Sequence, residues 1–164
     1  MSVICFHNPN ERNGYLSNWY KSTFEVDGVK FTSMEQCMMY GKAMLFNDVT
    51  TAKKIMNTQD VARIKALGRE VKHFNEQEWN KHKECIVLNG LYAKFTQNEE
   101  LKKKLLDTGD NLLAECAVKD RIWGIGLSMT DSNRLQPDRW RGQNLLGRAL
   151  MEVRFRIRLE ENKT

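Results

Sequence analysis

A carboxylate and an amine stand seven residues apart in a segment with helical spacing. Glu35 and Lys42 follow Ser33, which lies three residues before Gln36 in the spacing of a capping box, and apolar residues recur as far as Phe46. At about 100° per residue, positions seven apart face nearly the same way. The sequence therefore predicts a helix over 34–46 with a charged pair on one face.

Two interpretations of this helix are open. Glu35 could be a first-turn acid favoured by the helix dipole, while Gln36 and Lys42 could be ordinary solvent-facing residues. Apolar neighbours leave little polar face for the charged pair and favour a lined cleft instead: Met34, Met38, Met39, Tyr40 and Met44.

A second polar motif runs from Asp120 to Gly126. It places a carboxylate at the entry to a predicted strand, and Trp123 and two glycines follow. Gly124 and Gly126 would let a ligand or another segment approach the backbone. In the structural alternative, Asp120 is a turn residue and Trp123 is part of the core. Gly-x-Gly alone is no dinucleotide fingerprint, because the third glycine and the following helix are missing.

Two loops carry weaker candidates. Asn18 and Trp19 are of the types that hydrogen-bond a sugar or stack on a base, although a capped, half-buried loop explains them as well. Trp140 to Gly147 reads as a loop closing onto a helix, where Asn144 is either an N-cap or leaves free amide protons for an anion. Arg69 is a weaker candidate still.

The remaining pattern is that of an α+β fold, a helix-rich single domain over 1–164 around a small, mostly antiparallel sheet. A hairpin is expected within 19–31, because Asp27-Gly28 favours a type I′ turn. Strands are expected at 112–117 and 122–126, a loop at 127–143, and helices at 49–56, 60–66, 76–95, 98–107 and 144–159. Expected caps are Asp48, Asp60 and Asn75, and expected helix stops are Gly68 and Gly109.

Composition narrows the class of protein. The chain has 164 residues, 41% of them apolar and 29% charged, with two prolines, which fits one compact domain and excludes long disordered or collagen-like segments. No run approaches the roughly 18 apolar residues of a membrane span, and no export segment is evident, so we expect a cytoplasmic protein without a membrane partner. Four widely spaced cysteines argue against a disulfide framework or a zinc site and are expected to be reduced and mostly buried: Cys5, Cys37, Cys85 and Cys116.

The net charge of +5 comes largely from residues 138–158, which contain six arginines and only two acidic residues, Asp138 and Glu152. A solvated C-terminal helix explains this cluster, and a nucleic-acid or phosphate-bearing substrate would also use it.

Together these segments resemble the NADAR, or YbiA-like, domain family. The resemblance runs in order through Leu16-Ser17-Asn18, Ser33-Met34-Glu35-Gln36, Gly68-Arg69, Trp79, Leu112-Leu113-Ala114-Glu115 and Asp120-x-x-Trp123-Gly124. It ends on Trp140-x-Gly142-x-Asn144-x-Leu146-Gly147 and so covers most of the chain.

The resemblance implies a YbiA-like fold and hydrolysis of an N-glycosidic bond on a phosphorylated ribose. The substrate would be ADP-ribosylated guanine, free or within a nucleic acid, or a phosphoribosylamino-pyrimidine intermediate of riboflavin synthesis. The polar positions implied are Glu35, Lys42, Asp120, Trp123, Asn18 and Asn144. No metal or organic cofactor is required.

We assign roles as hypotheses. Cleavage of C1′–N builds positive charge on the ribose, so Asp120 would stabilise that charge or act as base, while Glu35 orients hydroxyls and passes protons. Lys42 would contact the substrate or attack an opened ribose as a Schiff base.

The other candidates would bind substrate. Trp19 and Trp123 would stack on the base, and Arg69 or the arginines near 139–148 would meet phosphate. Gly124, Trp140 and Asn144 complete the expected substrate-binding set. The alternative class is a non-catalytic module that binds ADP-ribose or a nucleotide, and the presence of both acids favours the hydrolase. The oligomeric state is open.

Overall fold

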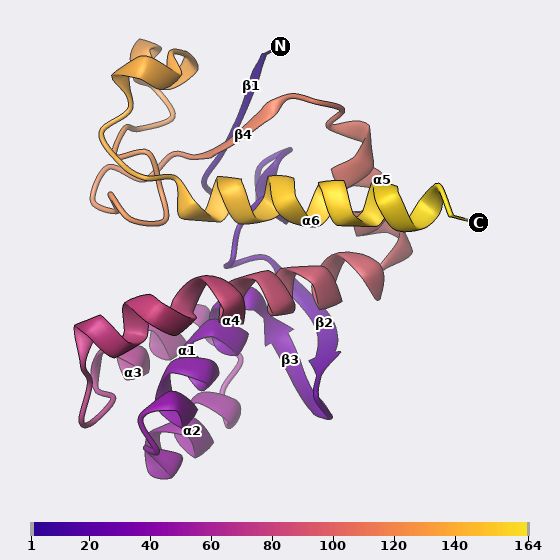
Figure 1. The fold of residues 1–164 in the computed structure, drawn as a ribbon. Coiled ribbons are helices and arrows are strands. Elements are labelled where there is room, and N and C mark those ends of the chain that lie inside the picture. The colour runs from indigo at the N-terminus through magenta and orange to yellow at the C-terminus, as the bar shows by residue number, and fades with distance from the viewer. Residues whose placement is uncertain (1, 164) are drawn as a thin grey trace. The chain divides into compact units, whose positions relative to one another are not determined.

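The computed structural model describes residues 2–163, which divide into two compact units. The first unit combines residues 2–20 with 95–163, and the second is Lys21–Lys94. Within the described residues there are six α-helices and four β-strands, which confirms the α+β class (Figure 1).

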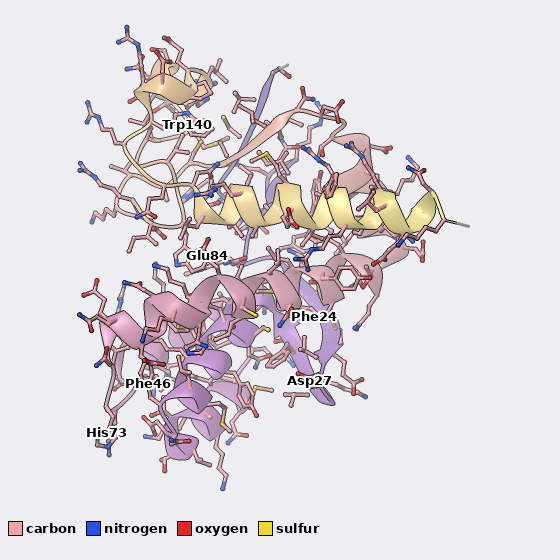
Figure 2. The ribbon with its side chains drawn as sticks, in the orientation of Figure 1. Phe24, Asp27, Phe46, His73, Glu84 and Trp140 are labelled. Atoms are coloured by element: carbon pink, nitrogen blue, oxygen red, sulfur yellow. The ribbon has the colours of Figure 1, made fainter. Side chains whose placement is uncertain are left out.

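The second unit opens with the predicted hairpin. β2 (Lys21–Val26) and β3 (Val29–Ser33) pair antiparallel, with Phe24 opposite Phe31. The tip residues Asp27 and Gly28 have φ values of 49° and 82°, the left-handed conformation that a type I′ turn needs. Figure 2 shows Asp27 at that tip.

Its helices are α1 (Met34–Leu45), α2 (Val49–Met56), α3 (Val61–Arg69) and most of α4 (Glu76–Thr96). The predicted caps are confirmed, since the side chains of Asp48, Asp60 and Asn75 accept backbone N–H groups of the first turns. Gly68 is not a helix stop as expected. It lies inside α3, where a β-carbon would meet the Met39 side chain, so Gly68 serves packing between α1 and α3.

Gln36 is a buried junction and not a solvent-facing residue. Its side chain is 2% exposed. Its Oε1 accepts from the Thr32 N–H at 2.8 Å, and its Nε2 donates to the carbonyls of Ile55 and Thr58, each at 3.1 Å. One amide thus joins β3, α1 and α2.

We expect Gln36→Met to lower the free energy of unfolding by about 3 kcal/mol, because it leaves buried backbone groups without partners at about 1–3 kcal/mol each. Urea unfolding followed by circular dichroism measures this loss. The matched change Gln77→Met, at an exposed position of α4, should alter stability by less than about 0.5 kcal/mol. Equal stability of the two variants would contradict the junction role.

The first unit contains a parallel strand pair. β1 (Val3–Phe6) runs beside β4 (Leu112–Glu115), with Val3 opposite Leu112 and Phe6 opposite Glu115 (Figure 1). The strands therefore form two separate pairs, one of them parallel, where one mostly antiparallel sheet was expected. No element was expected at β1, because four residues are too few to display an alternating pattern.

The other elements of this unit are α5 (Glu99–Asp107), α6 (Leu145–Glu161) and the short 3-10 turns η1 (Gly14–Leu16), η2 (Ser132–Leu135) and η3 (Pro137–Arg139). α6 packs on β4, which confirms the expected docked C-terminal helix. Gly109, two residues past α5 with a φ of 64°, confirms the second expected stop.

Much of the basic C-terminal cluster is engaged within the unit. Arg154, 6% exposed, donates to Thr108 Oγ1 at 2.8 Å. Arg158 pairs with Asp110 at 2.8 Å, and Arg156 pairs with Glu152 at 3.1 Å. Arg154 and Arg158 thus attach α6 to residues 108–110, while Arg156 pairs within the helix. Arg139, Arg141 and Arg148 are exposed and pair with no acid among the described residues. Among the described residues no helix is long and apolar enough to cross a membrane.

Candidate active site

The ten residues expected from the sequence fall in both units. Glu35, Lys42 and Arg69 lie in the second unit, and the other seven lie in the first. Over residues 2–163, no three His, Cys, Asp or Glu side chains gather as a candidate metal site.

The first turn of α1 buries Glu35. Ser33 caps the helix, its Oγ accepting from the Gln36 N–H at 3.1 Å, and this cap fixes where the turn begins. Glu35 is only 5% exposed. A first-turn acid that merely serves the helix dipole does not need such burial, and the charge of this carboxylate also acts on Lys42.

Lys42 lies two turns along the same helix under an aromatic ring. Its side chain is half-buried, and Nζ lies 4.6 Å from the centroid of the Phe74 ring. Phe74 in turn meets Phe46 edge-on at 5.4 Å between ring centroids. Neither aromatic was among the site candidates predicted from the sequence, where Phe46 was only an apolar helix position. The available signal was Phe74, which stands alone in the polar stretch before α4.

The electrostatic surroundings of Lys42 come from the two other candidates in this unit. Burial lowers the pKa of Lys42 below its ordinary value, the Glu35 carboxylate opposes that lowering, and the Arg69 guanidinium adds to it. The structure thus brings Glu35 and Arg69 each within electrostatic range of Lys42. A lysine with a lowered pKa has a larger neutral fraction near neutral pH, and the neutral amine is the nucleophile.

Opposite shifts are expected from removing the two charged neighbours. Glu35→Gln removes the charge that raises the pKa of Lys42, so that pKa falls and amine reactivity appears at lower pH. Arg69→Gln removes a repelling cation, so the pKa of Lys42 rises and reactivity appears at higher pH. Labelling of Lys42 by a small amine-reactive reagent across a pH series, read by peptide mass spectrometry, measures both shifts.

The exposed Lys30 in each variant is the internal control, and its labelling profile should not move. Shifts of the same sign in the two variants, or no shift in either, would contradict the assigned neighbours.

The methionines around the pair do not line a cleft as expected. Met34, Met38 and Met39 are at most 7% exposed and belong to the core, whereas Met44 is 41% exposed. Met34 lies against Gly90 of α4 and Met39 against Gly68 of α3. Their spacing on α1 therefore reflects helix packing.

Asp120 organises the loop that carries Trp123. Its Oδ1 accepts the N–H of Ile122 at 3.0 Å and of Trp123 at 2.8 Å. None of the described residues hydrogen-bonds the other oxygen, Oδ2.

Residues 122–126 form a bent loop, so the expected strand is wrong. The Asp120 cap bends the start of the segment. The carbonyls of Gly124 and Ile125 then accept from the Asn144 and Arg141 N–H groups at 3.0 and 2.8 Å, which ties the loop to the segment before α6. These hydrogen bonds to the segment before α6 take the place of the strand-to-strand hydrogen bonds that a β-strand would make.

The close approach at Gly124 is made by this chain itself. A β-carbon at Gly142 would lie 2.2 Å from the Gly124 carbonyl oxygen, so only glycine fits there. As expected, Gly124 lets another segment approach its backbone, and that segment is residues 141–144 of this chain. Trp123, half-buried, stands in this clamped loop.

At the start of α6, the N–H groups of Leu145, Leu146 and Arg148 all donate within this chain, which disfavours the expected anion site. The N–H groups of Leu145 and Leu146 donate to the carbonyls of Ile122 and Trp123, each at 3.1 Å. Asn144 has left-handed backbone and its side chain caps nothing. Its amide accepts from the Glu115 N–H at 3.1 Å and donates to the Leu113 carbonyl at 2.9 Å, which attaches α6 to β4.

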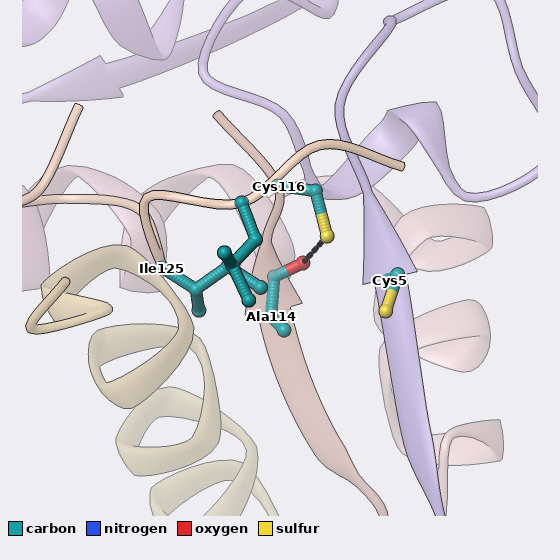
Figure 3. Close-up of a cluster of buried hydrophobic side chains, with 5 residues drawn as sticks. Cys5, Ala114, Cys116 and Ile125 are labelled. Carbon is teal, nitrogen blue, oxygen red and sulfur yellow. Dashed lines mark hydrogen bonds between the residues drawn. The ribbon is translucent and has the colours of Figure 1, made fainter. Parts of the chain in front are cut away.

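Trp140 supports the loop over the strand pair. Its Nε1 donates to the Arg134 carbonyl at 2.8 Å, and its ring packs on the buried cluster that contains Cys5, Cys116 and Ile125 (Figures 2 and 3).

Among the polar candidates, Asn18 has a buried side-chain oxygen without a hydrogen-bond partner within residues 2–163. It is 7% exposed, and its Oδ1 has no hydrogen-bond partner among the described residues. A buried oxygen in this state costs about 1–3 kcal/mol unless a ligand donor meets it. The neighbouring Trp19 is 36% exposed, and its ring is thus accessible.

Comparisons with known proteins cover nearly the whole chain. N-glycosidase R617 of Acanthamoeba polyphaga mimivirus is 40% identical over 168 residues, spanning 98% of this chain and 96% of the relative. N-glycosidase YbiA of Escherichia coli is 28% identical over 160 residues, spanning 98% and 91%. Riboflavin biosynthesis protein VVA0006 of Vibrio vulnificus is 34% identical over 151 residues, which is 92% of this chain but 37% of that protein.

The fold is similar to that of a solved relative. The NMR structure of the E. coli protein YbiA superposes with a TM-score of 0.82 at 26% identity, covering 99% of this chain and 89% of that one. The NADAR domain profile matches residues 5–158, which include parts of both units. By sequence and by fold, this chain belongs to the NADAR domain family.

Proposed function

We propose that this chain hydrolyses the C1′–N bond between a phosphorylated ribose and a base. The chain is a hydrolase acting on N-glycosyl bonds, since it belongs to the NADAR family and relatives spanning nearly its whole length are named N-glycosidases. The observation that carries the proposed chemistry is the pair on α1, a buried Glu35 with a half-buried Lys42 whose pKa is lowered by its burial.

The reaction needs a way to expel the base and to deliver water. In the covalent route, the neutral Lys42 amine bonds to C1′, the C1′–N bond breaks, and the base leaves with a proton. Opening of the ribose ring then gives an imine between Lys42 and C1′, and water hydrolyses that imine to the free sugar and the amine. Glu35, within electrostatic range of Lys42, is suited to carry protons in these steps.

Asp120 has the features of a charge stabiliser. Positive charge develops on the ribose as the bond to the base breaks, and a fixed carboxylate lowers the energy of that state. Because Oδ1 of Asp120 is bound to two backbone N–H groups, the position of Oδ2 is set in advance of substrate.

The remaining candidates supply binding. The Oδ1 of Asn18, which has no protein partner within residues 2–163, is suited to accept a hydrogen bond from a ribose hydroxyl. The partly exposed rings of Trp19 and Trp123 are suited to stack on a base. Arg69 is exposed and suits a phosphate group. So do the exposed arginines of the C-terminal cluster: Arg139, Arg141 and Arg148.

Two substrates fit this description. One is ADP-ribosylated guanine, free or within a nucleic acid, which would release ADP-ribose. The other is a phosphoribosylamino-pyrimidine intermediate, which would release ribose 5-phosphate, and the name of the Vibrio vulnificus relative favours it. The expected cytoplasmic location stays a prediction.

The test is a side-by-side assay of the purified protein on ADP-ribosylated guanosine and on a phosphoribosylamino-pyrimidine. Release of the sugar phosphate from either one supports the hydrolase and names its substrate. Binding of ADP-ribose without release from either substrate would overturn the proposal in favour of a non-catalytic binding module.

A further inference from the structure

A concave site lies in the first unit against β1 and η2. It is a cavity of about 390 Å³, within the size range of small-molecule sites. None of its lining residues is among the ten candidates described above. The lining combines two arginines, an amide, a thiol and apolar side chains: Arg12, Arg134, Asn13, Cys5, Met129 and Leu135.

The charge of this cavity is positive. Among residues 2–163 no carboxylate lies within ion-pair distance of Arg12 or Arg134. Arg134 is held in place, since its guanidinium donates to the Asp131 carbonyl at 2.9 Å and its own carbonyl accepts from Trp140 at 2.8 Å. A concave surface with two unneutralised cations, one of them held in place, raises the local concentration of anions.

The thiol in this cavity has an activating environment. Cys5 lies on β1 opposite Ala114 of β4. Cys116 follows directly after the end of β4 and lies near Cys5 (Figure 3). The adjacent Cys116 thiol, which donates to the Ala114 carbonyl at 3.9 Å, and the positive charge of Arg134 lower the pKa of Cys5 below that of a free cysteine, while burial opposes this lowering. The pKa of Cys116 is raised by its contact with Cys5. The Cys5 side chain is buried, at 8% exposed, and it is among the residues that line the cavity. Thiolates in positively charged surroundings are the reactive cysteines of proteins when a reagent can reach them.

We propose that this cavity is a modification site, in which small disulfides that carry carboxylates bind to the arginines and form a mixed disulfide with Cys5. The Cys5 thiolate attacks one sulfur of the bound disulfide, and a new bond forms between that sulfur and Sγ. The original S–S bond breaks, and the other half leaves as a thiolate that takes a proton from water. The disulfide is itself the oxidant, so no other redox partner is needed.

The experiment compares the rates at which an anionic and a neutral disulfide reagent react with the Cys5 thiol. The full chain with Cys85→Ser is used, because Cys85 is exposed and would react first, while Cys37 is buried with its pKa raised to about 12. The anionic probe is dithiobis-nitrobenzoate and the neutral probe is dithiodipyridine. Rates are followed by absorbance, and peptide mass spectrometry identifies the modified cysteine.

We expect Cys5 to be the modified residue and to react faster with the anionic probe relative to each probe's rate with free cysteine. Arg134→Gln and Arg12→Gln should each slow the anionic probe on the order of tenfold. The neutral probe reports any change in thiolate fraction and should slow much less. Arg63→Gln, an equal loss of charge on exposed α3, should change neither rate.

Three results would overturn the site: modification elsewhere than Cys5, no preference for the anionic probe, or equal slowing of both probes by the cavity arginine variants. None of these readouts depends on turnover, so the site and the proposed hydrolase stand or fall separately.

Discussion

Replacing Asp120 with Asn should lower kcat/KM for N-glycoside hydrolysis by about 100- to 10,000-fold, the range expected when a positioned acid–base or charge-stabilising group is lost. An Asn keeps the Oδ1 acceptor for the backbone N–H groups of Ile122 and Trp123, so the loop should stay folded. Steady-state kinetics on the substrate identified by the side-by-side assay measures this change, and thermal unfolding checks the fold.

Two further variants separate charge from structure at this position. Asp120→Ala removes both the charge and the loop cap, so it should lose activity and also about 1 kcal/mol of stability. Asp131→Asn is the matched control, because Asp131 Oδ1 caps the Asn133 N–H at 2.8 Å in the same unit, and this variant should keep turnover. Full turnover by Asp120→Asn would remove Asp120 from the chemistry.

The second large effect is expected at Lys42. Lys42→Met preserves a long apolar side chain against the Phe74 ring but removes the amine, so turnover should fall about 1,000-fold if the amine bonds to C1′. Borohydride added during turnover should reduce the imine and leave the sugar phosphate attached to Lys42, as read by peptide mass spectrometry.

Lys30→Met, at an exposed position of β3, is the control for loss of one lysine and should retain both turnover and trapping. Turnover of the unmodified protein without an adduct on Lys42 would reject the covalent route and leave Lys42 a non-covalent substrate contact. An adduct together with loss of turnover in Lys42→Met would establish the covalent route.

Local signals explain why much of the fold was predictable. The hairpin follows from Asp27-Gly28 between alternating residues, and the helix starts follow from Asp48, Asp60 and Asn75, because caps and turns depend on hydrogen bonds within a few residues. The strand predicted at 122–126 is wrong, because this apolar run resembles a strand while its backbone carbonyls accept from N–H groups of residues 141–146.

For the candidate site, the sequence by itself placed Glu35 and Lys42 on one face of one helix, since helical periodicity is a local property. It also supplied the motif residues that identify the family. Tertiary structure decided which of these polar groups are already hydrogen-bonded within the protein. Asn144 is bound to β4, whereas the Oδ1 of Asn18 is buried without a protein partner.

Tertiary structure also set the state of Lys42, which lies under Phe74 and within reach of the charge on Arg69, both far along the chain from α1. The parallel pairing of β1 with β4, which places Cys5 near Cys116, has the same origin. Burial, pKa values and strand pairing depend on groups that meet only when the chain folds, and no local pattern in the sequence contains that information.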